Sequence, residues 1–272
     1  MDDWKQARVV LELPGMAAIQ PSHQLIYQEV AGTAYGCDVY LPPSHQPGQL
    51  HPTILFVHGE GPAEILFDAK DWGQYVSWGQ LAAASGFAGV TFTHRSSGWF
   101  QRLPDVEADL NACLAFLRDN ATTCGLNLDQ LVVWVCSGGA PAIVSTLLRN
   151  RPAGLRALIA CYGRLALDPI AAQIDPPLPA TALARYSANA ALDELDPAGP
   201  PPLLLVRCGA DELPGVNDSI DAFTAAALAR NIPLELINYP AGVHGFDISN
   251  DTDDARQIIH RILAFASAQI TS

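Results

Sequence analysis

The sequence predicts an α/β protein whose sheet is built mainly from parallel strands. Three short apolar runs, each typical of a buried parallel strand and each followed by a glycine-containing turn, support this class: residues 131–135, 202–206 and 234–239. The first run leads through a turn of small residues into a new apolar pattern at helical spacing, which predicts a strand–turn–helix unit. The 272 residues, 49% of them hydrophobic, suffice for one large α/β domain over residues 1–272.

Further elements follow from the same patterns. Residues 53–57 form another apolar run, and we expect a strand there. Apolar residues on one face of residues 106–117 predict a helix. Residues 165–201 are rich in proline and alanine, with a possible short helix near residues 181–189. This segment is either a small cap over a functional site or a long surface connection.

The segment Asp129–Ala140, DQLVVWVCSGGA, predicts the position of a nucleophile. A serine at a sharp strand-to-helix turn, within the pattern G-x-S-x-G, is held with its hydroxyl exposed above the sheet. Centred on Ser137, the pattern has Val135 in place of the first glycine; centred on Cys136, it has Trp134 there. Valine is the smaller departure at a tight turn, so Ser137 fits better and Cys136 is the alternative nucleophile. An ordinary turn that uses serine and glycine would give the same letters.

A serine nucleophile needs a base and an orienting acid, which follow it in the chain as Asp or Glu and then His. Asp211 follows the run at residues 202–206, with Glu212 as a weaker rival. His244 follows the run at residues 234–239, between Gly242 and Gly245 on a loop. Either residue alone could be a turn or surface residue. Because all three occur in the required order at strand ends, we expect a triad of Ser137, Asp211 and His244.

Acyl transfer also needs donors for the developing oxyanion. The N–H after the nucleophile, that of Gly138, is the first candidate. The strand at residues 53–57 is followed by His58-Gly59-Glu60-Gly61-Pro62, which is similar to the HGGG-type loop of esterases. Proline has no N–H, so Glu60 or Gly61 would supply the second donor. A carboxylate at Glu60 would repel the anion unless it points away, and His58 is expected to be a structural loop residue.

At this point the chain resembles an α/β-hydrolase of the dienelactone hydrolase and small-esterase branch. Residues 37–43, CDVYLPP, are similar to the D-V-Y-x-P strand of such esterases. Thr93-His94-Arg95 with Leu103-Pro104-Asp105 resembles their Y-R-x…P…D segment. The resemblance implies an eight-stranded, mostly parallel sheet flanked by helices, and a hydrolase that needs no cofactor and acts on carboxylic esters. In dienelactone hydrolases the nucleophile is a cysteine, which keeps Cys136 open.

Composition limits the partners. The formal net charge of −13 disfavours nucleic acid and anionic membranes, and it suits neutral or cationic substrates. No C-x-x-C pair or H-E-x-x-H sequence supports a metal site, and no signal peptide or membrane span is apparent. Six scattered cysteines are interpreted as reduced thiols of a cytoplasmic protein. The sequence leaves open whether the protein is a monomer or a homodimer.

The sequence therefore predicts a cofactor-free serine carboxylesterase that acts on a small or medium neutral ester. One alternative is an enzyme of the dienelactone hydrolase type with Cys136 as nucleophile. The other is a catalytically silent α/β-hydrolase that binds a ligand, which Val135 and Glu60 would favour. Four aromatic residues are candidates for pocket walls, although core or edge packing is the favoured role for each one taken singly: Trp72, Trp78, Trp99 and Phe100.

Overall fold

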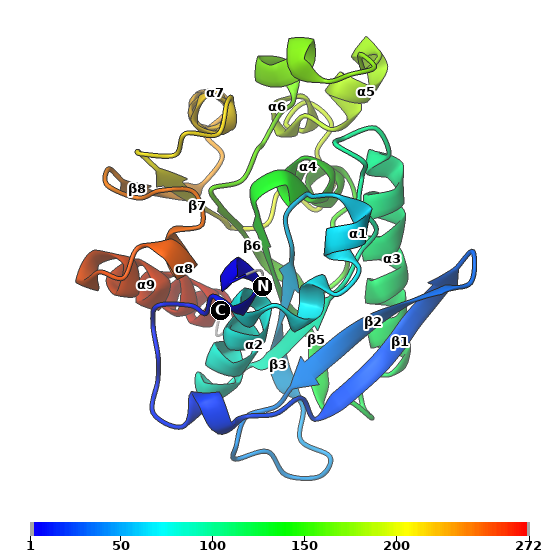
Figure 1. The fold of residues 1–272 in the computed structure, drawn as a ribbon, viewed down its shortest axis with the longest axis vertical. Helices are drawn as coiled ribbons and strands as arrows, with labels where there is room; N and C mark the ends of the chain where they lie inside the picture. Colours follow the sequence, from blue (N-terminus) through cyan, green and yellow to red (C-terminus); the bar gives the residue numbers. More distant parts are fainter. Residues whose placement is uncertain (1–2, 271–272) are drawn as a thin grey trace.

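The computed structural model describes residues 3–270, so the predicted domain of residues 1–272 extends two residues beyond it at each end. Its centre is one eight-stranded sheet in the order β1-β2-β4-β3-β5-β6-β7-β8 (Figure 1). The strands are β1 His23–Val30, β2 Thr33–Tyr40, β3 His51–Val57, β4 Ala88–Phe92, β5 Leu126–Cys136, β6 Leu155–Cys161, β7 Leu203–Cys208 and β8 Leu234–Tyr239. The pairs β1/β2 and β2/β4 are antiparallel, and all other pairs are parallel.

The central strands form because nearly every residue in them is apolar and covered on both faces. Residues 131–136 of β5 are all buried, and they pair with β3 on one side and β6 on the other. The peripheral hairpin of β1 and β2 differs, since β1 alternates between exposed and partly buried residues. The predicted strands at residues 53–57, 131–135 and 234–239 all lie within observed strands, and the run at 202–206 forms β7 from Leu203 onward.

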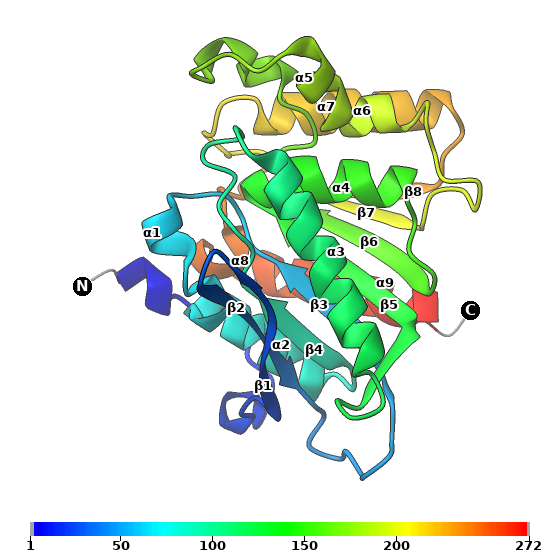
Figure 2. The same ribbon diagram turned by 90° about the vertical axis from the view of Figure 1, so that its right-hand side faces the viewer.

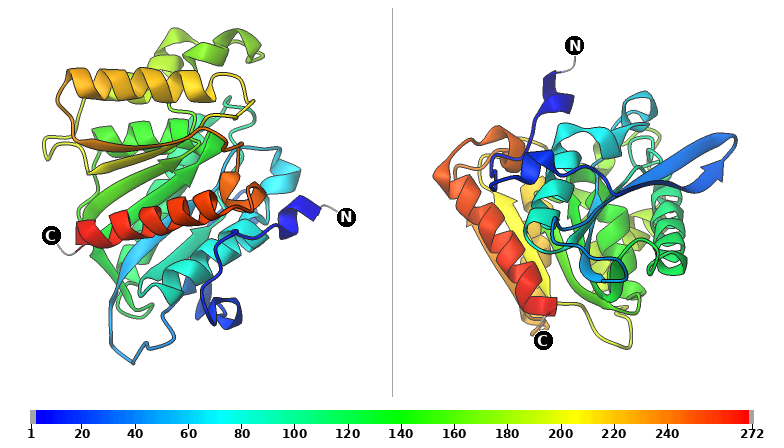
Figure 3. Two further views of the ribbon diagram at one scale, coloured as in Figure 1. Left: turned by 90° about the vertical axis from the view of Figure 1, so that its left-hand side faces the viewer. Right: turned by 90° about the horizontal axis from the view of Figure 1, so that it is seen from below.

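Helices cover both faces of the sheet. One face carries α2 and α9, and the other carries α3, α4 and α7 (Figures 2 and 3). The α-helices are α1 Ala63–Leu66, α2 Gly73–Ala84, α3 Leu103–Asp119, α4 Ala140–Arg149, α5 Ala180–Arg185, α6 Ala188–Ala191, α7 Val216–Ala229, α8 Phe246–Ser249 and α9 Asp253–Ile270. The 3-10 helices are η1 Asp3–Gln6, η2 Met16–Ala18, η3 Ala69–Asp71, η4 Ser137–Gly139 and η5 Asp168–Gln173.

The proline-rich segment at residues 165–201 contains three short helices, η5, α5 and α6. The expected helix near residues 181–189 is two helices, because the chain turns at Tyr186 and Ser187, whose hydroxyl accepts from the N–H of Ala190. Figure 2 shows α5 and α6 beside α7, above the layer that contains α4. The segment thus covers one end of the molecule and has no sheet of its own.

Two further findings concern membrane-spanning helices and the cysteines. No helix within residues 3–270 has the length and apolar character needed to cross a membrane. Each of the six cysteines is buried and unpaired.

Candidate active site

Ser137 lies at the sharp turn between β5 and α4. Its backbone is left-handed, with φ of +52°, which is costly for a residue with a side chain and is typical of a nucleophile elbow. The preceding residue, Cys136, is still in extended conformation with φ of −129°, so the chain reverses direction within one residue. This reversal directs the Ser137 side chain out of the sheet while its neighbours continue into a helix.

The elbow is possible because the residues after Ser137 are glycines. A Cβ atom on Gly138 would lie 2.5 Å from the Cβ of Glu60, and one on Gly139 would lie 2.3 Å from the carbonyl oxygen of His58. Val135, which replaces the first glycine of the pattern, is fully buried, and its Cγ2 faces the side of Gly139 that has no side chain. The loop after β3 therefore packs backbone against backbone on the start of α4.

His244 and Asp211 complete a hydrogen-bonded chain with Ser137. The Ser137 Oγ lies 2.7 Å from His244 Nε2, and His244 Nδ1 lies 2.7 Å from Asp211 Oδ2. The Asp211 carboxylate is buried, and its Oδ1 accepts a bond of 2.9 Å from the N–H of Leu213. The rival acid, Glu212, is exposed. The structure thus brings together the three residues that the sequence singled out.

The loops after β7 and β8 are bonded to each other, which fixes the acid relative to the base. The N–H of Ala210 donates to the carbonyl of Gly242 at 2.9 Å, and a Cβ on Gly209 would lie 2.5 Å from the carbonyl of Pro240. The His244 loop is also tied to the chain that follows, since the N–H of Val243 donates to Asn250 Oδ1 at 3.0 Å.

The loop after β3 brings a second backbone donor close to Ser137. A Cβ on Gly138 would lie 3.2 Å from the backbone nitrogen of Glu60, so these two N–H groups are neighbours, whereas Gly61 faces Leu66. His58 sets the orientation of the intervening peptide. Its Nε2 accepts from the N–H of His94 at 3.1 Å, so its Nδ1 is the donor in the 2.8 Å bond to the Gly59 carbonyl.

Because carbonyl and N–H point in opposite directions across a trans peptide, a Gly59 carbonyl held by His58 turns the N–H of Glu60 away from it. Burial and the nearby His94 hold the pKa of His58 well below its usual range, so this imidazole is neutral. The predicted structural role of His58 is consistent with these contacts.

The Glu60 carboxylate is bonded to the loop after β4. It accepts bonds from Ser96 Oγ at 2.9 Å, from Ser97 Oγ at 2.5 Å and from the N–H of Ser97 at 3.1 Å. Three donors on the loop after β4 therefore stabilise this charge. A Glu60 carboxylate bonded in this way is compatible with an oxyanion beside Ser137.

Cys136 faces the interior instead of the chain of Ser137, His244 and Asp211. Its side chain is 2% exposed, and its sulfur lies 3.5 Å from the hydroxyl of Tyr75. Burial raises the pKa of the Cys136 thiol to about 12, so it stays protonated at neutral pH. Its position therefore disfavours a thiolate nucleophile.

A buried polar network that sequence reasoning missed lies behind His244. The ring of Tyr162 packs edge-on against that of His244, with centroids 4.8 Å apart. Its hydroxyl donates to the fully buried Asp247 at 2.7 Å, which also accepts from Gln74 at 2.9 Å and Trp78 at 2.7 Å. Asp247 lies three residues after His244. The sequence signal for it is an acidic residue between the apolar Phe246 and Ile248.

A cavity of about 210 Å³ opens beside Ser137 and His244, with Tyr75, Trp72 and Leu66 among its walls. A second pocket, of about 370 Å³, is lined by Trp99 and Phe100. Three of the four aromatic candidates thus line pockets. Trp78 has the core position that the sequence favoured over a pocket wall. It is fully buried and packs between Phe56 and Trp134, because the face of α2 that carries it turns to the sheet.

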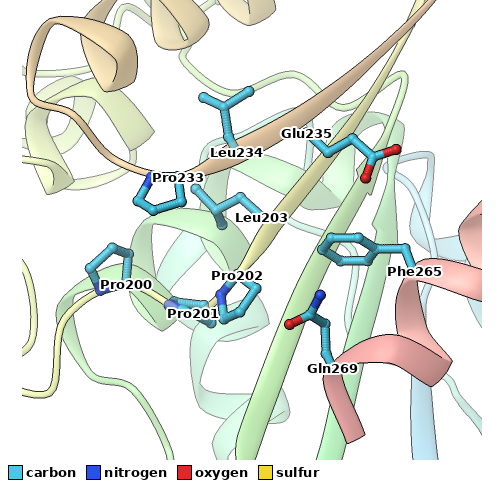
Figure 4. Close-up of a pocket in the computed structure, with 9 residues that line it drawn as sticks. All are labelled: Pro200, Pro201, Pro202, Leu203, Pro233, Leu234, Glu235, Phe265 and Gln269. Carbon is cyan, nitrogen blue, oxygen red and sulfur yellow. The ribbon is translucent and has the colours of Figure 1, made fainter. Parts of the chain in front are cut away.

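Another pocket, of about 380 Å³, lies away from the site (Figure 4). Its walls come from Leu203 and Leu234, where β7 and β8 begin, and from Phe265 on α9. Since Asp211 and His244 follow the other ends of these strands, this pocket has no part in the chemistry of Ser137. Within residues 3–270 no three metal-ligating side chains gather into a site.

Comparisons with known proteins agree on the architecture. The BD-FAE family model matches residues 37–155. Esterase 2 of Thermogutta terrifontis superposes in its apo form with a TM-score of 0.70 at 18% identity, covering 94% of each chain. Its butyrate-bound form gives 0.69 at 16% identity, over 92% of this chain and 95% of that one. Its form phosphorylated by paraoxon gives 0.68 at 17%, over 94% and 93%. No curated protein sequence matches the chain.

Proposed function

Since the chain has the α/β-hydrolase fold, we propose that it is a serine hydrolase that cleaves carboxylic esters through an acyl-enzyme. The observation that carries this proposal is the chain of hydrogen bonds from Ser137 through His244 to the buried Asp211, at 2.7 Å and 2.7 Å. The similar Thermogutta terrifontis protein is an esterase, and its forms with butyrate and with paraoxon-derived phosphoryl fit a serine nucleophile and a short acyl group.

In the acylation step, His244 Nε2 accepts the proton of Ser137 as its Oγ attacks the ester carbonyl. Asp211 holds the imidazole with Nδ1 protonated and stabilises the imidazolium that forms. The proton then passes from His244 to the leaving alcohol, and the acyl group stays on Ser137. In deacylation, a water molecule loses its proton to His244, attacks the acyl carbonyl and releases the acid.

The N–H groups of Gly138 and Glu60 are the proposed oxyanion donors, with Gly61 the less favoured one. Loss of a single donor of this kind typically costs about 2.7–4 kcal/mol of transition-state stabilisation. The Glu60 carboxylate, bonded to Ser96 and Ser97, leaves its own backbone N–H free for this role. The segment at residues 165–201 is proposed to act as a small cap over the site.

The test compares the wild type with Ser137→Ala and Cys136→Ala on a short-chain 4-nitrophenyl ester. Alanine keeps a Cβ at the left-handed position, so Ser137→Ala leaves the fold unchanged and is expected to abolish turnover. Cys136→Ala removes only a buried thiol, and it is expected to keep most of the activity. Circular dichroism of both variants checks the fold.

Two results would contradict the proposal. Activity that survives in Ser137→Ala and disappears in Cys136→Ala would favour a thiol nucleophile of the dienelactone hydrolase type. A folded wild type that neither hydrolyses esters nor reacts with a fluorophosphonate probe would favour a catalytically silent binding protein, because only an activated serine reacts readily with that probe.

A further inference from the structure

The pocket of about 370 Å³ beneath the segment at residues 165–201 contains a buried positive charge. Its walls include Trp99 and Phe100 from the loop after β4, Ile170 and Ile174 from the cap segment, and Arg164 from the loop after β6. Arg164 is only 7% exposed, and its guanidinium lies over the ring of Phe100 at 5.8 Å. A pocket with mostly apolar walls and a few polar or charged groups is typical of a small-molecule subsite.

The charge of Arg164 lacks the partner that comparable arginines have. Arg95 pairs with the buried Asp109 at 2.6 Å, and Arg149 pairs with Glu194 at 2.5 Å. Among the ion pairs formed within residues 3–270, none involves Arg164, whose guanidinium donates to the carbonyl of Pro214. A buried cation without a direct ion pair is costly. Burial lowers the pKa of Arg164 below its usual value, and the nearby carboxylate of Asp211 opposes this shift in part.

The aromatic wall of the pocket is held in a strained conformation. Gly98, Trp99 and Phe100 all have positive φ, of +60°, +55° and +73°. For the two aromatic residues this backbone is costly, and such strain gathers at ligand sites. The N–H of Phe100 donates to Ser97 Oγ at 2.8 Å, which helps to hold the turn. Trp99 remains 61% exposed at the pocket.

Each wall of the pocket is attached to a part of the proposed active site. The N–H of Arg164 donates to the carbonyl of Ser137 at 3.0 Å. Ser97, which bonds Phe100, also bonds the Glu60 carboxylate at 2.5 Å. Pro214 lies three residues after Asp211. The walls of the pocket are therefore bonded to the residues around Ser137, and they share no residue with the cavity that contains Tyr75 and Trp72.

We propose that Arg164 binds an ionised carboxylate of the substrate, so that the ester cleaved at Ser137 carries a free carboxylate on its acyl or its alcohol part. This inference rests on the proposed esterase function and names its substrate class. A guanidinium pairs with a carboxylate through parallel N–H donors, and Trp99 and Phe100 supply apolar surface for the rest of the group. The ligand carboxylate would form the direct ion pair that Arg164 does not form with Asp211, the nearby acid.

This substrate class differs from the neutral one that the net charge of −13 favours. The repulsion between the net charge and an anionic substrate acts over long distances. Salt weakens this repulsion beyond a Debye length of about 8 Å at physiological ionic strength. The attraction to Arg164 acts at contact in a buried pocket, where screening is weak. The one acid lining the pocket, Asp175, is exposed, so water reduces its repulsion.

The first test measures kcat/KM for two pairs of esters that differ only in charge. Mono(4-nitrophenyl) adipate and its methyl ester place the carboxylate on the acyl side, and 3-acetoxybenzoate and its methyl ester place it on the alcohol side. For each pair, the ratio of kcat/KM for the charged ester to kcat/KM for the neutral ester is compared between variants. In one pair, we expect this ratio to be about tenfold or more lower in Arg164→Met than in the wild type, because a charge-assisted bond is lost. Arg164→Lys is expected to keep part of the ratio.

Arg102→Met is the matched control. Arg102 lies beside the same loop, 3.6 Å from the position of a Cβ on Gly98, but its side chain is 58% exposed. We expect it to leave both ratios unchanged. If Arg164→Met lowers the rates for charged and neutral esters equally, Arg164 only supports the Asp211 loop and the proposal is wrong. Ratios that Arg164→Met leaves unchanged in both pairs overturn it as well.

The second test does not depend on catalysis. Binding of 3-phenylpropionate and of its uncharged amide to Ser137→Ala is measured by calorimetry. The subsite is supported if Ser137→Ala binds the carboxylate more tightly than the amide and if adding Arg164→Met abolishes this preference. This result would count even if the protein hydrolyses no ester. Equal binding of the two compounds, or no binding of either, overturns it. Failure of the esterase proposal is thus distinguished from failure of the subsite.

Discussion

The buried imidazole of His58 links the stability of the protein to acidity. Its pKa is well below the ordinary value of about 6.5 because of burial and the nearby His94. The group is neutral in the folded and unfolded states above that pH. Below it, the unfolded chain binds a proton that the folded chain does not, so stability falls by up to about 1.4 kcal/mol per pH unit.

We therefore expect His58→Asn to unfold with a weaker dependence on pH than the wild type between about pH 6.5 and pH 5. Urea unfolding at several pH values measures this slope. The exposed His260 provides the control, since His260→Asn is expected to keep the wild-type slope. Parallel slopes for His58→Asn and the wild type would contradict a neutral, buried His58.

At the scale of elements, the strand–turn–helix unit of β5, η4 and α4 tolerates a valine where the pattern has glycine. Val135 is fully buried, and it faces Gly139 at the start of α4. Restoring the pattern with Val135→Gly would leave a cavity in the core and a more flexible strand end. We expect a loss of roughly 2–4 kcal/mol in the free energy of unfolding and no gain in activity.

Denaturant unfolding and the rate of ester hydrolysis of Val135→Gly measure these two quantities. Val135→Ala is the control for the cavity alone, and it is expected to lose less stability than the glycine variant. A glycine variant that is as stable as the wild type and faster would show that Val135 impairs the elbow.

The network around Asp247 joins α2 and the segment after β6 to the chain that follows His244. Its carboxylate accepts from Gln74 and Trp78 on α2 and from Tyr162 after β6. Asp247→Ala leaves these buried donors without an acceptor, and it is expected to cost roughly 3 kcal/mol or more. Tyr162 packs against His244, so kcat should fall as well. Thermal unfolding and ester hydrolysis measure both effects, and unchanged kcat in a destabilised variant would limit the network to folding.

The elements differ in how well local sequence predicts them. The core strands were predicted because their burial appears as uninterrupted apolar runs. β5 begins before its run because Leu126 and Asn127 still pair with His51 and Pro52 of β3. Ser137, Asp211 and His244 could be singled out because each follows such a run. Arg164 could not, since its burial depends on Phe100 and Pro214, which are distant in sequence.

At the scale of the whole molecule, the net charge of −13 opposes the approach of an anionic substrate. Raising the ionic strength from about 0.01 M to about 0.15 M shortens the Debye length from about 30 Å to about 8 Å. This change screens the long-range repulsion more than the contact with Arg164. We expect kcat/KM for mono(4-nitrophenyl) adipate to rise with salt, and that for its methyl ester to stay constant.

Measuring the same two esters with Arg164→Met separates the long-range repulsion by the net charge from the contact with Arg164. The rise with salt should persist in that variant, because it comes from the charge of the whole surface. A fall with salt for the charged ester in the wild type would show that local attraction also governs its approach.

The left-handed backbone of Ser137 has a consequence for how such a chain evolves. A glycine at this position would adopt the same φ of +52° without the clash that a side chain brings, at an entropic cost smaller than the strain it relieves. Selection for stability alone would therefore favour drift away from serine. A serine on a strained residue of this turn is therefore better explained by the proposed reactivity of its hydroxyl than by its contribution to folding.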